Sequence, residues 1–329
     1  MTHLPVVRAS SPKNDTPWIG PRGERMARLE LHLTYTCPER CAFCSEEHRM
    51  RTYRRYPVTW ARVATVLRTH ASRGVKSVHL TGGEPTIFPE FIDVLRLAKK
   101  LGMRTSVGTI GTKLADRAWA SEALPWLDEA LFSLHAPSAE LHDALTGRAG
   151  SFEQVVAAIE NVRALDPSFG AYVNTVVTRK NLEVLPDTVA LAARLGAKLV
   201  VVSNLTPEGN GLDNYSELAA SLDDLRRVLP RVPERAGNAI LRFFGTPMCV
   251  LGEHTMLSND LHWDPRVTVE WQSAPGKVVF DGIYTWTPDR KRVHVAECSS
   301  CELSRVCMGV FDRYAELFPT TSLSPRRGP

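Results

Sequence analysis

The stretch LELHLTYTCPERCAFC, residues 29–44, joins a short apolar run to three closely spaced cysteines. The run LELHLT is bounded by turn-forming residues, which predicts a buried β-strand over residues 29–34. Cys37, Cys41 and Cys44 follow directly, so we expect them on the loop at the carboxyl end of that strand. In parallel α/β folds this end of the sheet carries the chemistry.

Five more apolar runs follow and alternate with segments of helical spacing. Two of the helices are predicted to end at Gly74 and Gly102, and a third begins with Ser151 as its cap. Strand and helix alternating in this way predict right-handed crossovers and a parallel sheet. The predicted fold class is α/β, with a partial (β/α)6 TIM-like barrel over residues 28–235. The five runs are residues 76–81, 103–108, 128–134, 171–177 and 197–203.

The sequence changes character after residue 235. Four segments there are typical of short antiparallel strands, and SAPGK, residues 273–277, predicts a hairpin turn. We expect a small C-terminal α+β cluster-binding domain over residues 236–319. Both ends, residues 1–27 and 320–329, are rich in Pro, Ser, Thr and Arg and are predicted to be flexible. The four strand segments are residues 239–244, 266–272, 277–286 and 292–297.

The amino-acid composition limits the classes of protein to which the chain can belong. The 329 residues are 43% hydrophobic and 23% charged, which is typical of a globular protein, and the net charge of +4 is too small to imply a nucleic-acid partner. No apolar run is long enough to cross a bilayer, and the first residues lack the features of a secretory signal, so we expect a cytoplasmic protein without a membrane partner. The seven cysteines cluster as three and four, which favours metal sites over disulfides.

The first three cysteines have the spacing Cys-x3-Cys-x2-Cys. Soft thiolates at this spacing select zinc or an iron–sulfur cluster. A closed structural site needs four protein ligands, yet no fourth cysteine occurs before Cys249. Three thiolates on a [4Fe-4S] cluster would leave one iron open for a substrate or cosubstrate. The alternative is a zinc knuckle completed by a histidine such as His48.

With Phe43 as its aromatic residue, the motif Cys-x3-Cys-x-aromatic-x-Cys resembles the signature of the radical S-adenosylmethionine (SAM) superfamily. The resemblance implies that the open iron chelates the amino and carboxylate groups of SAM. It also implies that a reduced cluster splits SAM to a 5′-deoxyadenosyl radical, which takes a hydrogen atom from the substrate. An external one-electron reductant such as flavodoxin or ferredoxin is then expected.

Three further positions resemble SAM contacts of that family. LTGGEP, which contains Gly82, Gly83 and Glu84, is similar to the motif that holds the SAM amino group, although a simple strand-to-helix turn is the alternative. Ser133, at the end of the predicted fourth strand, resembles a residue that contacts the SAM ribose or carboxylate. Asn174, on the fifth strand with Thr175, resembles another, although the usual Gly-x-Ile-x-Gly-x-x-Glu pattern is absent there.

Other polar groups permit two interpretations. His135 and His142 are as consistent with local hydrogen bonding as with catalysis. The run HRMRTYRRY, residues 48–56, favours a solvated face over a clamp for an anionic substrate. SNLTPEGNG, residues 203–211, is interpreted as a turn rather than a cover over the SAM adenine.

The remaining cysteines are expected to form a second site. Cys298, Cys301 and Cys307 lie within ten residues, with Cys249 upstream, and four thiols suit zinc as well as an iron–sulfur cluster. The run resembles the auxiliary-cluster region of the SPASM and twitch branches of the radical SAM superfamily. Phe311 occupies a position where a full SPASM domain has another cysteine. The resemblance therefore implies one auxiliary [4Fe-4S] cluster.

The resulting hypothesis is a radical SAM enzyme that acts on a peptide or natural product and drives oxidation, cyclisation or bond formation. A peptide substrate implies direct recognition or a separate peptide-binding partner. The alternatives are the same chemistry on a small metabolite or cofactor precursor, a role in installing a radical on a partner protein, and a zinc-binding adaptor without catalysis. The family preference for peptides is an analogy and carries no residue-level argument.

Overall fold

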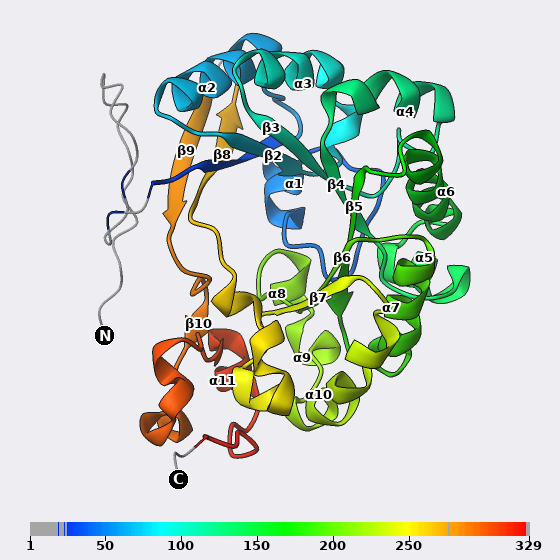
Figure 1. Cartoon of the computed structure of the whole chain (residues 1–329). Helices are drawn as coiled ribbons and strands as arrows, with labels where there is room; N and C mark the ends of the chain where they lie inside the picture. Colours follow the sequence, from blue (N-terminus) through cyan, green and yellow to red (C-terminus); the bar gives the residue numbers. More distant parts are fainter. Residues whose placement is uncertain (1–18, 20–22, 24, 276, 327–329) are drawn as a thin grey trace.

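The computed structural model describes residues 19, 23, 25–275 and 277–326. A nine-stranded sheet dominates this described part, in the order β7-β6-β5-β4-β3-β2-β1-β8-β9 (Figure 1). Strands β1 to β8 run parallel to their neighbours, and β9 is antiparallel to β8. The strands are β1 Arg28–Thr34, β2 Ser77–Gly82, β3 Arg104–Thr109, β4 Glu129–Ser133, β5 Gly170–Val177, β6 Leu199–Asn204, β7 Ile240–Phe244, β8 Arg266–Ala274 and β9 Lys277–Thr285.

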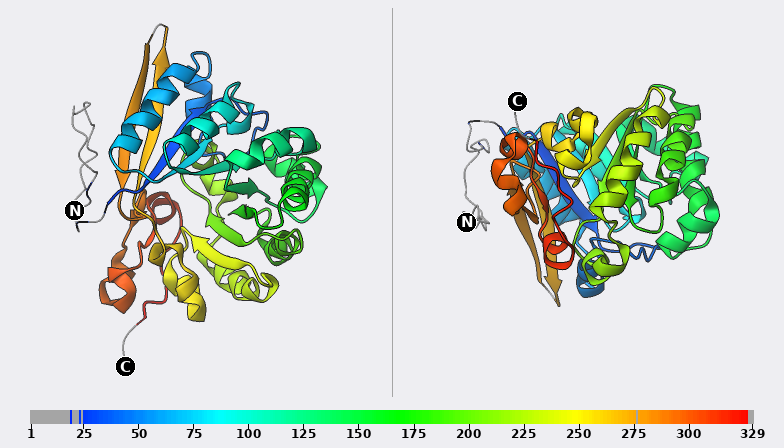
Figure 2. Two further views of the ribbon diagram at one scale, coloured as in Figure 1. Left: turned by 45° about the horizontal axis from the view of Figure 1, so that its top comes forward. Right: turned by 90° about the horizontal axis from the view of Figure 1, so that it is seen from below.

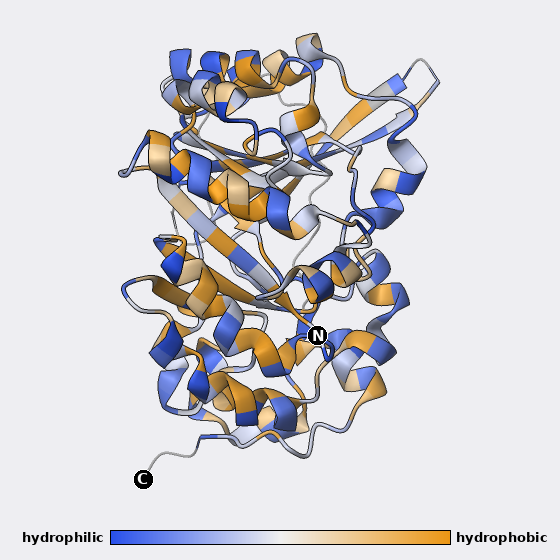
Figure 3. Ribbon diagram, turned by 90° about the vertical axis from the view of Figure 1, so that its right-hand side faces the viewer, coloured by the Kyte–Doolittle hydropathy of each residue, from blue (hydrophilic) through white to orange (hydrophobic). Residues whose placement is uncertain are grey.

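Helices cover the outer side of the curved sheet, and Figure 3 shows their hydrophobic and hydrophilic residues in alternation. In α3 the buried residues Phe91, Val94, Leu95 and Ala98 recur at the helical period and face the sheet. The helices are α1 Glu47–Tyr53, α2 Trp60–Ser72, α3 Phe91–Lys100, α4 Arg117–Ala123, α5 Ala139–Thr146, α6 Ser151–Leu165, α7 Leu185–Arg194, α8 Asn210–Asp213, α9 Tyr215–Leu218, α10 Leu222–Val228 and α11 Asp312–Leu317. None of the helices in the described part combines the length and the apolar character that a bilayer span requires.

The six strands predicted for the barrel are confirmed as β1 to β6, and the α/β partial-barrel fold class is confirmed with them. Along β5, buried and half-buried residues alternate because Val173 and Thr175 face the helices while Tyr172 and Asn174 face the interior of the barrel. The predicted cap of α6 is wrong. Ser151 is the first helical residue, and the carboxylate of Asp143 instead accepts hydrogen bonds from the N–H groups of Gly150 and Phe152.

Of the segments predicted to be antiparallel strands, β7 is instead parallel to its neighbour, and β8 is antiparallel to β9 but also extends the main sheet as a parallel neighbour of β1. β7 pairs with β6, since residues 205–239 contain α8, α9 and α10 and are long enough for a crossover connection. β8 pairs with β1 on the opposite side of the sheet. The predicted hairpin is confirmed, because β8 and β9 are antiparallel and Ala274 lies opposite Lys277. Strands from both sides of residue 235 thus belong to one sheet, and a separate domain that begins at residue 236 stays a prediction.

A small antiparallel pair follows the hairpin, formed by β10 Arg292–Val293 and β11 Val310–Phe311. Both views in Figure 2 show this C-terminal segment beside residues 245–262. Phe311 is buried, and its ring packs against Gly245. The described part of the tail, up to residue 326, is packed against the rest of the chain rather than free. Leu323 is buried, and the carbonyl oxygen of Arg326 accepts a hydrogen bond from Glu302 N–H. Most of the predicted N-terminal segment, residues 1–27, lies outside the described residues.

Candidate functional site

Cys37, Cys41 and Cys44 lie on the loop between β1 and α1, at the carboxyl end of the strands, as the sequence predicts. All three thiols are free and half-buried. Burial raises the pKa of Cys37 and of Cys44 to about 12, and it raises the pKa of Cys41 well above its usual value. A bound iron would lower the pKa of these thiols, because a thiol that coordinates a metal gives up its proton.

The glycines of LTGGEP join the end of β2 to the start of the cysteine loop. Gly83 N–H donates to Thr34 O at 2.6 Å, and Glu84 N–H donates to Thr36 O at 2.8 Å. A β-carbon at Gly82 would lie 2.4 Å from Thr34 O, and one at Gly83 would lie 2.3 Å from Thr36 O. The two glycines are therefore needed because another backbone approaches them, immediately before Cys37.

Glu84 is fully buried and binds its own chain. Its carboxylate accepts hydrogen bonds from Ile110 N–H at 2.8 Å and from Thr109 Oγ1 at 2.8 Å, both at the end of β3. Burial raises the pKa of Glu84, and the hydrogen bonds from Thr86, Ile110 and Thr109 act in the opposite direction. Glu84 thus fixes the ends of β2 and β3 relative to each other, and its contact with SAM stays a prediction.

One side of the cysteine loop is held by the end of α5. Arg40 N–H donates to Thr146 O at 2.8 Å, and Ala42 N–H donates to Leu145 O at 3.2 Å. Gly147 follows with a φ of 65°, and a β-carbon there would lie 2.9 Å from Arg40 O. The residue after α5 must therefore adopt a left-handed backbone conformation and also lack a β-carbon.

The other side of the loop is held by two asparagines of the segment interpreted above as a turn and its continuation. Asn210 Nδ2 donates to Cys41 O at 3.0 Å, and Asn214 Nδ2 donates to Ala42 O at 2.9 Å. Asn210 N–H also donates to Cys44 O at 2.8 Å. Neither asparagine is predicted as a site residue from the sequence. The available signal was an asparagine-rich and glycine-rich segment, GNGLDN, after the end of a central strand.

Replacing Asn210 and Asn214 together by alanine is expected to loosen the cysteine loop without unfolding the barrel. Each replacement removes a net contribution of about 0.5–1.5 kcal/mol and leaves a carbonyl group without that donor. We expect iron to leave the double variant several-fold faster in the presence of a chelator, measured by the decay of absorbance near 400 nm. Asn238→Ala is the control, because Asn238 is exposed and remote from the loop. Equal rates for both variants would contradict the role of the asparagines.

Phe43 and the two histidines form an aromatic stack beneath the loop. The Phe43 ring packs edge-on against His135 with centroids 4.7 Å apart, and His135 stacks on His142 at 5.6 Å. Burial lowers the pKa of both histidines, so they are neutral. His48 Nε2 lies 2.8 Å from Asp213 Oδ2. The proposed knuckle ligand is thus engaged by a carboxylate.

Ser133 and Asn174 lie directly opposite each other on β4 and β5. Asn174 Oδ1 accepts a hydrogen bond from Ser203 Oγ at 2.6 Å, and both of these side chains line a cavity inside the barrel. Thr175 faces the helices and is fully buried, so it does not reach this cavity. The structure therefore brings Ser133, Asn174 and Ser203 together, and their contacts with SAM stay predictions.

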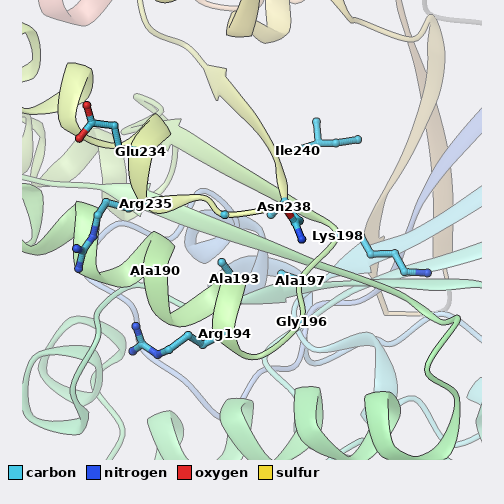
Figure 4. A pocket seen from close by; sticks show the side chains of 12 residues that line it. Ala190, Ala193, Arg194, Gly196, Ala197, Lys198, Glu234, Arg235, Asn238 and Ile240 are labelled. Carbon is cyan, nitrogen blue, oxygen red and sulfur yellow. The ribbon is translucent and has the colours of Figure 1, made fainter.

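The cavity has a volume of about 640 Å³ and extends from Ser45, next to the cysteine loop, to Arg28 at the start of β1. A larger pocket of about 750 Å³ lies between α7 and the start of β7, where Arg194, Lys198 and Ile240 are among its lining residues (Figure 4). That pocket is at the amino end of the strands, whereas the barrel cavity is lined by Ser45, the residue after Cys44. The barrel cavity is the one that adjoins the thiols.

The arginine-rich run at residues 48–56 is mainly a solvated face, as the sequence favours. Arg51, Arg54 and Arg55 are exposed. Arg49 forms ion pairs with Glu46 at 3.4 Å and with Glu270 of β8 at 2.7 Å, so carboxylates of the same chain neutralise its charge.

The four late cysteines line one small cavity in the C-terminal segment. Cys249 lies on the η6 turn, Met248–Val250, and the other three lie between β10 and β11. The buried sulfur of Cys307 accepts hydrogen bonds from Met248 N–H and Gly309 N–H, each at 3.4 Å. Backbone N–H groups aimed at sulfur stabilise a thiolate and are typical of iron–sulfur sites.

Comparison with known proteins decides the family. The family model named Radical SAM superfamily matches residues 31–192, which contain the second half of β1, the cysteine loop, the glycine motif and β2 to β5. The chain belongs to the radical SAM superfamily. It is thus a radical SAM enzyme, and membership implies a [4Fe-4S] cluster and SAM. The three thiols without a fourth cysteine nearby in the sequence, beside an open cavity, fit that cluster.

Individual relatives are more distant. The PqqA peptide cyclase of Rhodopseudomonas palustris is 31% identical over 194 residues, which are 58% of this chain and 50% of that protein. The probable GTP 3′,8-cyclase of Saccharolobus islandicus is 32% identical over 208 residues, 63% of this chain and 64% of that one. This chain thus matches about half to two thirds of these relatives. A solved structure titled native anSMEcpe with bound AdoMet shares the fold with a TM-score of 0.63, 18% identity and coverage of 91% of this chain and 93% of that one.

Proposed function

We propose that this radical SAM enzyme takes a hydrogen atom from a peptide or peptide-like natural product and so drives its oxidation, cyclisation or bond formation. The observation that carries the proposal is the cysteine loop beside a cavity of about 640 Å³, which Ser45 lines directly after Cys44. The name of the PqqA peptide cyclase supports a peptide substrate.

The cysteine loop would hold the cluster, and neighbouring residues would hold SAM. When bound, the cluster supplies one electron that splits SAM into methionine and a 5′-deoxyadenosyl radical, which abstracts the hydrogen atom. Gly82 and Gly83 keep the loop against β2, while Ser133 and Asn174 offer polar groups to SAM from β4 and β5. Phe43 excludes water beneath the loop because it is buried on His135. A one-electron reductant such as flavodoxin or ferredoxin completes the scheme.

We further propose that Cys249, Cys298, Cys301 and Cys307 bind one auxiliary [4Fe-4S] cluster. All four thiols line one small cavity, and the N–H groups of Met248 and Gly309 are directed at the Cys307 sulfur, which supports a cluster held by four thiolates. Full ligation suits electron transfer, so this cluster would accept the second electron of an oxidation.

A small metabolite is the second candidate, because one relative is named as a probable GTP 3′,8-cyclase. A nucleoside triphosphate carries several negative charges and requires several free cations. Arg28 and Arg266 line the barrel cavity and pair with Asp264 and Glu30, which leaves Arg242 without a carboxylate partner among the described residues. One free guanidinium suits a substrate with a single anionic group better than a triphosphate.

Anaerobic purification tests the proposed function directly. We expect a brown protein with about eight irons and about eight sulfides per chain. With dithionite and SAM it should produce 5′-deoxyadenosine, measured by liquid chromatography. A colourless protein that contains zinc and produces no 5′-deoxyadenosine would instead establish the adaptor alternative.

Cys301→Ala is expected to distinguish the roles of the two proposed clusters. The variant should lose about four irons and keep the formation of 5′-deoxyadenosine from SAM, because Cys301 lies outside the barrel. Product formation from a peptide substrate should be lost. Cys41→Ala is the matched variant: it should also lose about four irons and the product, but it should lose 5′-deoxyadenosine formation as well, since it removes a thiol of the cysteine loop. If Cys301→Ala also abolished 5′-deoxyadenosine formation in soluble, folded protein, the late site would not be auxiliary.

A further inference from the structure

We propose that Arg242 binds a carboxylate group of the substrate inside the barrel and thereby selects substrates with an acidic group near the reacting carbon. The inference rests on the proposed function, since it assumes that the substrate occupies the barrel cavity. Arg242 lies on β7 and lines that cavity. It lies outside residues 31–192, the part matched to the superfamily.

Among the described residues, no carboxylate around the cavity pairs with Arg242. Glu30 is 3.1 Å from Arg266, Asp264 is 3.9 Å from Arg28, and Glu129 is 3.1 Å from Arg104. Each carboxylate that lines the cavity therefore has a guanidinium partner of its own. Within the described part of the chain, Arg242 donates only to the carbonyl oxygen of Leu241, at 2.9 Å. A guanidinium has five N–H donors in a planar fork that matches a carboxylate, so most of its capacity is unused.

A second unused donor lies close by. Trp263 also lines the cavity, and its Nε1 is buried without a hydrogen-bond partner among the described residues. Its ring stacks on Phe244 with centroids 6.2 Å apart. Phe244 is two residues after Arg242 and on the same face of β7, so the two are separated by about 7 Å along the strand. A charged donor and an indole N–H beside one apolar wall form a site for a carboxylate on an apolar stem.

The position of Arg242 along the strand suits the substrate rather than SAM. The register places Arg242 opposite Val201 of β6, and Val201 opposite Asn174 of β5. Arg242 is therefore level with the proposed SAM contacts Asn174 and Ser133, and about 10 Å from Asn174 across two strand spacings. A carboxylate at Arg242 would thus leave space between it and SAM for the rest of the substrate.

Chemical modification by phenylglyoxal, which reacts with accessible guanidinium groups, tests the inference in the anaerobic enzyme with both clusters. Modification of Arg242 is followed by peptide mapping, and the exposed Arg51, Arg54 and Arg55 serve as internal references. The probes are N-acetylglutamate α-amide, which carries only a side-chain carboxylate, and N-acetylglycine, which carries only a terminal one. N-acetylglutamine α-amide with sodium chloride is the neutral control at equal ionic strength. Because a single small-ligand contact is weak, each probe is used at about 0.1 M.

We expect at least one carboxylate probe to slow modification of Arg242 several-fold, while the neutral control and the three reference arginines remain unchanged. The probe that protects identifies whether the enzyme accepts a side-chain or a terminal carboxylate. Protection by neither probe would overturn the inference. Equal protection by SAM alone would also overturn it, because Arg242 would then bind the carboxylate of SAM.

Arg242→Gln provides the second measurement, with Arg242→Lys as the matched variant that keeps the charge. The probe that protects Arg242 should raise the melting temperature of the wild-type enzyme and of Arg242→Lys, but not that of Arg242→Gln; an equal rise in Arg242→Gln would overturn the inference. If the wild-type enzyme forms no 5′-deoxyadenosine, the proposed function fails. If it does, but Arg242 is not protected, only this inference fails.

Discussion

Replacing Cys37, Cys41 and Cys44 together by alanine is expected to abolish the reductive cleavage of SAM. The three thiols are the protein ligands at the mouth of the barrel, and with Cys249 the next cysteine in the sequence no nearby thiol can substitute. We expect 5′-deoxyadenosine formation under dithionite to fall below detection and iron to fall by about four per chain. The fold should persist, since the loop backbone is held by β2, α5 and α8.

The matched control is the replacement of Cys298, Cys301 and Cys307 by alanine. It removes the same number of thiols, and it should retain 5′-deoxyadenosine formation. Both variants are compared by circular dichroism to show that folding is preserved. Continued cleavage of SAM in the first variant would mean that the radical is generated elsewhere, and the assignment of the cysteine loop would be wrong.

Gly83→Ala is expected to have the second largest effect. The added β-carbon would lie 2.3 Å from Thr36 O and 2.7 Å from Thr36 C, and both are backbone atoms that cannot turn away. Relief requires the segment before Cys37 to move, which costs about 1–3 kcal/mol of stability. A displacement near 1 Å at a reacting centre reduces the rate by about a hundredfold. We therefore expect SAM cleavage to fall by one to two orders of magnitude, measured as initial rate.

Gly74→Ala separates this effect from a general loss of stability. Gly74 has a φ of 85° at the end of α2, so alanine is strained there, but no atom of the described residues lies within 4 Å of the added β-carbon. We expect a lower melting temperature with an unchanged rate of SAM cleavage. If both variants lost activity in proportion to their stability, the backbone contact at Thr36 would have no special role.

Local patterns in the sequence predicted much of the fold and of the site. The strands β1 to β6 are short apolar runs with glycine-terminated helices between them, so each element could be recognised by itself. The cysteine spacing is likewise local. Because three thiols without a fourth already imply an open metal position, Cys37, Cys41 and Cys44 could be placed before the fold was known.

Long-range pairing was the part that the sequence did not reveal. The alternation in β7 and β8 is the same for a parallel and an antiparallel strand, so their partners depend on how the chain returns to the sheet. Asn210 and Asn214 bond the cysteine loop across sequence separations of 169 and 172 residues, and no periodicity marks that contact. Arg242 was missed for a related reason, since its charge becomes conspicuous only once the other cavity arginines are seen to be paired.

The position of β1 between β2 and β8 limits how this enzyme can be dissected in the laboratory. β1 leads into the cysteine loop, and its Leu29 and Leu31 pair with Val267 and Val269 of β8. A shortened chain that stopped after β7 would uncover that edge and would lack Trp271, whose ring packs at a tilt against Tyr35 with centroids 4.3 Å apart. An exposed strand edge invites aggregation. Any minimal version of the catalytic barrel therefore has to retain the β8–β9 hairpin.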